Sequence, residues 1–146
     1  MSNVTALLAN KNGDMWSVSP EDTVLDAIKM MAEKNVGALT VTVNDELVGI
    51  ISERDYTRKV VLNDRTSSTT LVKDIMSKQV YYAQPDQSID DCMILMTEHR
   101  VRHLPVLDDK KLVGMISVGD VVKAIINDQK YTIKQLENYI SWEENY

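Results

Sequence analysis

The chain has 146 residues, and its apolar fraction of 44% is enough to bury the core of one ordinary domain or of two small units. A formal charge of -6, from 16 basic and 22 acidic residues, argues against nucleic acid as a general partner. The single cysteine, Cys92, excludes an internal disulfide and a CxxC metal pair. Since neither a signal-peptide pattern nor eighteen consecutive apolar residues occur, the sequence predicts a soluble, cytoplasmic protein without a membrane segment.

The first half of the chain contains alternating helical and strand patterns. Residues 4–20, "VTALLANKNGDMWSVSP", predict a helical turn and then a strand. The following "TVLDAIKMMAEK" has apolar residues at helical spacing, and Thr23 with Asp26 marks its start. "ALTVTV" and "LVGIIS" are typical of two strands, and the polar "NDE" between them predicts a hairpin. A second helix is expected from Glu53 to about Asn63.

The second half shows the same order of patterns after "NDRTSSTT", residues 63–70, which is polar and predicts a linker. "LVKDIMSKQVYYAQP" predicts a helical turn and a strand, and "SIDDCMILMTEH" predicts a helix that begins after Ser88. "HLPVL" and "LVGMIS" predict a second hairpin, and a helix follows from Val118 to about Asp128. Both halves are therefore predicted to be β-α-β-β-α units.

An ungapped internal repeat confirms that the two halves correspond. When the sequence is shifted by 65 positions, residues 16–60 lie on residues 81–125 with thirteen identities. These include the glycines of the two "LVG" triplets and the serine and aspartate of "SERD" and "SVGD". Because the unit occurs twice, the chain is predicted to be a pair of mixed α/β units, in the α+β class, and not a solenoid.

The C-terminal segment, residues 131–146, is predicted to be a separate helical tail. In "YTIKQLENYISWEENY", Ile133, Leu136 and Ile140 fall on one helical face, and Thr132 with Gln135 could form a capping box. The tail is expected to pack on the body or across a dimer. Since the apolar helical faces exceed what a small module needs internally, a homodimer is expected.

Two serine and aspartate pairs occur where a strand ends and a helix begins. Ser52 with Asp55, and Ser117 with Asp120, have the spacing of a capping box. The same groups suit a ligand, because a carboxylate accepts both ribose hydroxyls while the serine hydroxyl and the free helix amides face a phosphate. The spacing is compatible with either role or with both.

Basic residues lie near these pairs. Arg102 and His103 begin the second hairpin, whose geometry is expected to bring them toward Ser117 and Asp120. The alternative is a solvated basic edge. Arg54 is the cation of the first unit, and its alternative is a surface ion pair of little energetic weight.

The stretches "VGALTVTVNDELVGIISERDYTRKV" and "VRHLPVLDDKKLVGMISVGDVVKAI" resemble the CBS domain, which is named after cystathionine β-synthase. The resemblance assigns the first repeat to residues 4–62, the linker to 63–70 and the second repeat to 71–128. It implies a CBS-domain pair, or Bateman module, whose halves pack with pseudo-two-fold symmetry. It further implies a regulatory module that binds AMP, ADP or ATP in the clefts between its repeats and modulates a partner protein.

The resemblance also carries site residues to this chain. In the family the acid of the motif holds the ribose and basic residues at the hairpin strand hold phosphates, whereas the first repeat here has Gly37 and Ala38 at those basic places. The second repeat is therefore expected to make the tighter phosphate contacts. The complete candidate set for nucleotide binding is Ser52, Arg54, Asp55, Arg102, His103, Pro105, Ser117, Asp120 and Ala38.

Alternatives to nucleotide sensing are a binder of S-adenosylmethionine or NAD(H), and a structural dimerisation module without a ligand. An enzyme is not expected, because only His99 and His103 are available as histidine bases and Cys92 falls on an apolar helix face. No metal-ligand spacing and no catalytic cofactor are predicted.

Overall fold

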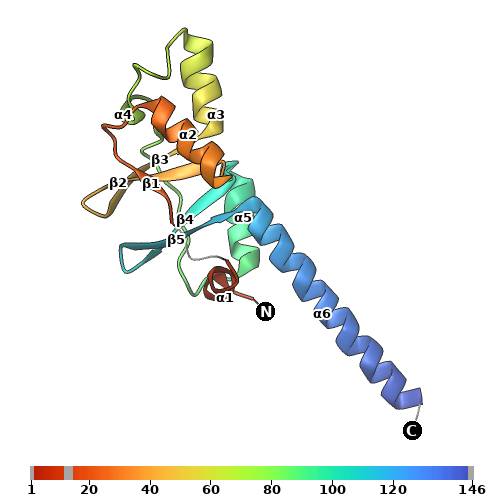
Figure 1. Ribbon diagram of the computed structural model, residues 1–146. Coiled ribbons are helices and arrows are strands. Elements are labelled where there is room, and N and C mark those ends of the chain that lie inside the picture. Colours follow the sequence, from red (N-terminus) through yellow and green to blue (C-terminus); the bar gives the residue numbers. More distant parts are fainter. Residues whose placement is uncertain (1, 12–14, 145–146) are drawn as a thin grey trace.

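The computed structural model describes residues 2–11 and 15–144, and Figure 1 shows two small lobes with one long helix leaving them. The strands and the helices of the first half are α1 (Val4–Ala9), β1 (Ser17–Val18), α2 (Val24–Lys34), β2 (Ala38–Val43), β3 (Glu46–Ser52) and α3 (Glu53–Asp55). A π-helical turn (Tyr56–Val60) and a 3-10 turn (Val61–Asn63) follow α3. The second half contains α4 (Val72–Ile75), α5 (Ile89–His99), β4 (His103–Asp108), β5 (Lys111–Ser117) and α6 (Val118–Glu144).

The two halves have equivalent strand pairing, so the predicted tandem architecture is confirmed. Strand β2 pairs antiparallel with β3, and β4 pairs in the same way with β5. Strand β1 runs parallel to β2, with Val18 beside Val41. In the second half the predicted first strand is reduced to a single parallel bridge between Ala83 and Val106, which lie 65 positions after that pair.

Local side-chain interactions explain how the elements begin and turn. The hydroxyls of Thr23 and Ser88 accept hydrogen bonds from the amides three residues later, as their sequence spacing predicts. The first hairpin turns through Asn44 and Asp45, which both have positive φ angles, a combination that matches the right-handed twist of paired strands. Asp109 and Lys110 repeat this geometry in the second hairpin.

The helix that follows the second hairpin is longer than predicted. The expected end near Asp128 is wrong, because α6 continues without a break to Glu144 and includes the predicted tail up to that residue. No glycine or proline occurs after the first helical turn, so no residue interrupts the helix. Thr132 does not cap a separate helix, because its hydroxyl donates to the carbonyl of Asp128 within α6.

The short helices α1 and α4 pack in the opposite halves of the molecule. Val4 and Leu7 of α1 lie in the core around α5, β4 and β5, whereas Val72 and Ile75 of α4 lie in the core around α2, β2 and β3. Backbone hydrogen bonds fix the exchange, since Val4 donates to the carbonyl of Gln87 and, in the other half, residue 72 donates to that of residue 22. Each folded unit is therefore completed by a segment of the other predicted repeat.

This exchange explains the glycine of each "LVG" triplet. A Cβ atom at Gly49 would lie 2.8 Å from Sδ of Met76, directly after α4. A Cβ atom at Gly114 would lie 2.8 Å from Cδ2 of Leu8, in α1. Both distances are shorter than a van der Waals contact, so each exchanged segment approaches its strand closely only because a side chain is absent there.

Candidate functional site

The first serine and aspartate pair forms a capping box at the start of α3. The backbone amide of Ser52 donates to Oδ2 of Asp55 at 2.9 Å, and the amide of Asp55 donates to Oγ of Ser52 at 3.2 Å. The other carboxylate oxygen, Oδ1, lies 2.9 Å from Nζ of Lys59. Asp55 is 9% exposed. A largely buried carboxylate is thus held at a helix start by the cap and by a lysine.

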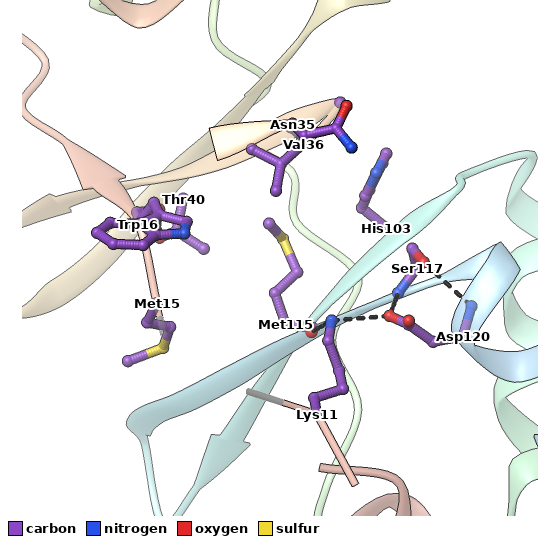
Figure 2. A pocket seen from close by; sticks show the side chains of 12 residues that line it. Lys11, Met15, Trp16, Asn35, Val36, Thr40, His103, Met115, Ser117 and Asp120 are labelled. Atoms are coloured by element: carbon purple, nitrogen blue, oxygen red, sulfur yellow. Dashed lines mark hydrogen bonds and ion pairs between the residues drawn. The ribbon is translucent and has the colours of Figure 1, made fainter. Parts of the chain in front are cut away.

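The second pair has the same cap geometry but a different cation. The amide of Ser117 donates to Oδ2 of Asp120 at 2.8 Å, and the amide of Asp120 donates to Oγ of Ser117 at 3.1 Å. Nζ of Lys11 donates to the same Oδ2 atom at 2.7 Å and to the carbonyl of Met115 at 2.7 Å (Figure 2). Lys11 follows α1, so the exchange between the halves brings it to this helix start.

Each pair lines its own cleft. The cleft at Asp120 encloses about 310 Å³ and is called the Asp120 cleft; Figure 2 shows Lys11, Trp16, Thr40 and His103 around it. The cleft at Asp55, called the Asp55 cleft, encloses about 840 Å³. Its apolar lining includes Ala38, Ile50, Val80, Tyr81 and Val101. His103, Gly37 and Ala38 line both clefts and therefore lie between them.

Both clefts combine residues of the two predicted repeats. Residues 35–38, which enter β2, line the Asp120 cleft, and residues 100–103, which enter β4, line the Asp55 cleft. The expected convergence of Arg102 with Ser117 and Asp120 is therefore wrong: Arg102 lines the cleft that contains Asp55. In the hairpin register His103 is paired with Ser117, and the side chain one residue earlier points to the opposite face.

The remaining candidates are placed as follows. Arg54, as expected for the first repeat, lines the Asp55 cleft beside Ser52. Ala38 is the first residue of β2. It is buried, and its small side chain forms part of the wall of both clefts. Pro105 is buried in β4 and lines neither cleft, so the structure gives it a packing role.

The two clefts differ strongly in charge. Among the described residues, Lys11 is the one cation that lines the Asp120 cleft, and it is already bound to Asp120. Five cations and two acids line the Asp55 cleft. The cations are Arg54, Arg58, Lys59, Arg100 and Arg102, and the acids are Glu53 and Asp55. This distribution places Arg102 and Arg100 of the second repeat in the cleft of the first serine and aspartate pair, and which cleft binds a phosphate stays a prediction.

Sequence reasoning missed four of these cations. Arg58 and Lys59 follow the "SERD" motif by one turn, and a search for positive residues along that helix would have indicated them. Arg100 lies at the C-terminal cap of α5 with a positive φ angle of 55°. Lys11 carried no local signal, because only the exchange of α1 brings it near Asp120.

The carboxylate of Asp120 is stabilised in its ionised form. Burial raises the pKa of this group, but the hydrogen bond from Lys11, the amide of Ser117 and the charge of Lys11 together outweigh burial and lower the pKa below its ordinary value. A ligand that uses this carboxylate must therefore displace or share the ammonium group of Lys11.

Burial lowers the pKa of His103, while the nearby Asp120 carboxylate only partly opposes that shift. The imidazole between the clefts is therefore neutral at neutral pH. It offers one donor and one acceptor and adds no cation to either cleft.

The depressed pKa of His103 predicts a pH dependence of stability. Below a pH of about 6.5 the unfolded chain binds the proton more readily than the folded chain, so the free energy of unfolding should fall as the pH decreases. We expect urea unfolding to show lower stability at about pH 5.5 than at about pH 7.5. His103→Asn should lose part of this difference. An unchanged difference in this variant would contradict the assignment.

Comparison with known proteins agrees with the tandem architecture. A family model described as the CBS domain matches residues 10–62 and 72–127. The chain belongs to the CBS-domain family.

Among the described residues of this CBS-domain protein, no helix has the length and apolar character that crossing a membrane requires. The same residues contain no group of three or more histidine, cysteine, aspartate and glutamate side chains arranged to hold a metal ion.

Relatives include free-standing CBS proteins and solved CBS pairs. The mitochondrial protein CBSX3 of Arabidopsis thaliana is 42% identical over 131 residues, which cover 86% of this chain and 63% of CBSX3. The chain thus spans less than two thirds of that relative. A protein with CBS domains from Burkholderia ambifaria has a solved structure with 53% identity and a TM-score of 0.85, covering 88% of this chain and 96% of that one.

A more distant CBS pair shares the fold. The pair of protein MJ0100, solved in complex with 5′-methylthioadenosine and S-adenosyl-L-methionine, has a TM-score of 0.76 and 21% identity. The alignment covers 87% of this chain and 98% of that one. Adenosine-containing ligands thus occur within this fold.

Proposed function

We propose that this CBS pair is a regulatory module that binds a phosphorylated adenosine ligand, AMP, ADP or ATP, in the Asp55 cleft and modulates a partner protein. The observation that carries the proposal is the convergence of four arginines, Arg54, Arg58, Arg100 and Arg102, on the cleft that also contains the buried carboxylate of Asp55. The fifth cation, Lys59, is bound to Asp55 and to the carbonyl of Ile75, as Lys11 is bound in the other cleft. A cationic cleft concentrates anionic ligands and places several charge-assisted donors around a phosphate chain.

The parts of such a ligand match different walls of the Asp55 cleft. The carboxylate of Asp55 is an acceptor for ribose hydroxyls, in the role that the family resemblance implies. Arg54, Arg58 and Arg102 offer guanidinium groups, which bind phosphate oxygens in pairs. Tyr81, stacked on His99 at a centroid distance of 3.8 Å, provides an aromatic wall for a purine ring.

We propose that the Asp120 cleft does not bind the phosphate groups of a ligand. Its volume of about 310 Å³ is smaller, and its cation is engaged with Asp120 and with the carbonyl of Met115. A ligand in the Asp120 cleft would gain little binding free energy from electrostatic attraction. The module is therefore proposed to bind phosphorylated ligands at one cleft and not at two equal ones.

NAD(H) remains an alternative, because its pyrophosphate has the charge that the Asp55 cleft attracts. S-adenosylmethionine, found in MJ0100, carries a sulfonium cation that five positive side chains would disfavour. A ligand-free dimerisation module is the third possibility.

Catalysis is not proposed. Cys92 is buried, and burial together with Asp91 raises the pKa of its thiol, which keeps the thiol protonated.

Calorimetric titration with AMP, ADP, ATP, NADH, S-adenosylmethionine and adenosine tests the proposal. We expect affinity to increase with the number of phosphates and to decrease as the salt concentration rises, because screening weakens the attraction. Adenosine or S-adenosylmethionine binding as tightly as ATP would contradict the phosphate assignment. Binding of none of the six at millimolar concentration would favour the structural alternative.

The proposal also includes a partner protein that the module regulates and a cytoplasmic location. The predicted cytoplasmic location rests on the sequence pattern alone, whereas the relative CBSX3 is mitochondrial. A homodimer is also proposed, and the long helix α6 supplies a surface on which it can be tested.

A further inference from the structure

The turn between α5 and β4 holds Arg100 in a backbone conformation that long side chains rarely adopt. Its φ and ψ angles are 55° and 41°, which lie in the left-handed region. This region is unfavourable for most residues, because the Cβ atom comes too close to a carbonyl oxygen. Glycine has no Cβ atom, and asparagine can form a local hydrogen bond, so these two residues commonly end helices in this way. Local geometry therefore disfavours an arginine here.

The first repeat forms the same turn with an asparagine. Asn35, which lies 65 positions before Arg100, ends α2 with φ and ψ angles of 55° and 48°. The hydrogen bonds are equivalent as well. The amide of Asn35 and the next amide donate to the carbonyl of Met31, and the amide of Arg100 and the next amide donate to the carbonyl of Met96. The turn thus forms without an arginine.

The two positions differ in the cleft that each one lines. Asn35 lines the Asp120 cleft, whereas Arg100 lines the Asp55 cleft. Arg100 is exposed, and no residue that the structure describes forms an ion pair with its guanidinium group. Lys59 of the same cleft, in contrast, is already paired with Asp55. Arg100 is therefore a cation that an anionic ligand can reach without breaking an ion pair.

We propose that Arg100 is a specificity-determining residue of the Asp55 cleft, which selects ligands by their phosphate groups. The inference rests on the proposed function, because it concerns the phosphate end of the same ligand. A guanidinium group binds two phosphate oxygens in a fixed planar geometry, and asparagine does not supply this charged contact. The phosphate contact accounts for an arginine at a position where asparagine would make the fold more stable.

The left-handed conformation by itself does not indicate a ligand. Lys110, at the tip of the second hairpin, also has a positive φ angle, 67°, and it lines neither cleft. What distinguishes Arg100 is its place in the cationic cleft. A cation near the C-terminus of a helix also interacts favourably with the helix dipole, which would give Arg100 a purely structural role. The two explanations predict opposite effects of an asparagine on stability.

Thermal unfolding of Arg100→Asn without ligand separates the two explanations. We expect the melting temperature to rise by about 2 to 4 °C, because asparagine tolerates the left-handed conformation better than arginine. Lys110→Asn is the matched control, since it removes the same charge and changes the same type of backbone position outside the clefts. A lower melting temperature of Arg100→Asn would show that the arginine stabilises the helix end, and would overturn the proposal.

Calorimetric titration measures the selection of phosphates. We expect Arg100→Asn to weaken the binding of ATP and of inorganic tripolyphosphate about tenfold, and to change the binding of adenosine by less than about threefold. Arg100→Lys should have an intermediate ATP affinity, because lysine keeps the charge but not the paired hydrogen bonds. Lys110→Asn should change the affinity for all three compounds by less than about threefold.

The results distinguish failure of this inference from failure of the proposed function. Unchanged binding of ATP and tripolyphosphate by Arg100→Asn would overturn the inference and leave the proposed function intact. An equal loss in Lys110→Asn, or an equal loss for adenosine, would also overturn the inference. A wild-type chain that binds tripolyphosphate through Arg100 but does not bind ATP would contradict the proposed function alone. A wild-type chain that binds neither compound would overturn both.

Discussion

Arg102→Ala is expected to weaken ATP binding about ten- to a hundredfold, because a hydrogen bond to a charged group contributes about 1.5 to 3 kcal/mol. The residue lines the Asp55 cleft together with Arg54, Arg58 and Arg100. Lys11→Ala is the control in the Asp120 cleft and should change the affinity by less than about threefold. Calorimetric titration measures both variants.

The paired carboxylates give a second arm of this experiment. Asp55→Asn should reduce nucleotide affinity by about tenfold, because the ribose loses a charged acceptor, whereas Asp120→Asn should leave it nearly unchanged. Asparagine retains an oxygen for the capping bond to the amide of Ser52 or Ser117. Equal losses at both positions would mean that both clefts bind. A lower melting temperature without loss of affinity would mean that the pairs serve only as caps.

Ile75→Ala is expected to lower the free energy of unfolding by about 2 to 5 kcal/mol, the usual cost of such a truncation in a packed core. Ile75 belongs to α4, which the sequence assigns to the second repeat, yet it is 1% exposed within the core of the first lobe. Leu62→Ala is the control, because Leu62 is 70% exposed and should cost less than about 0.5 kcal/mol. Urea unfolding gives both values.

The comparison also tests the exchange of α1 and α4. If the helices were docked loosely, Ile75→Ala would destabilise the protein no more than Leu62→Ala does. A large loss at position 75 together with a similar loss for Leu7→Ala, in α1, would show that each lobe depends on a segment from the other repeat. The repeat boundaries predicted at residues 4–62 and 71–128 would then describe the sequence duplication better than the folding units.

Local patterns were sufficient for much of the fold. The hairpins follow from strands that flank short polar turns, and the caps at Thr23, Ser88, Ser52 and Ser117 follow from a three-residue spacing. Interactions of this kind join residues that are close in the chain, so the sequence displays them directly. The repeat at an offset of 65 residues predicted the equivalence of the lobes for the same reason.

The assembly of the clefts depended on contacts between distant segments. The sequence placed Arg102 with Asp120, because both belong to the second repeat, but the structure places Arg102 across the lobe boundary with Asp55. Lys11 reaches Asp120 over 109 positions of the chain. Neither pairing leaves a periodic or spaced signal, because each depends on how one lobe docks against the other.

The sequence by itself thus determined the family, the two hairpin units and the capped helix starts, since these rest on periodicity and short-range hydrogen bonds. Only the tertiary structure decided which cations share a cleft with which carboxylate, because that grouping depends on the exchange of α1 and α4 and on the placement of Arg102, just before β4, and His103, its first residue, in different clefts. The charge difference between the clefts is a consequence of that docking, and the proposed phosphate site depends on it.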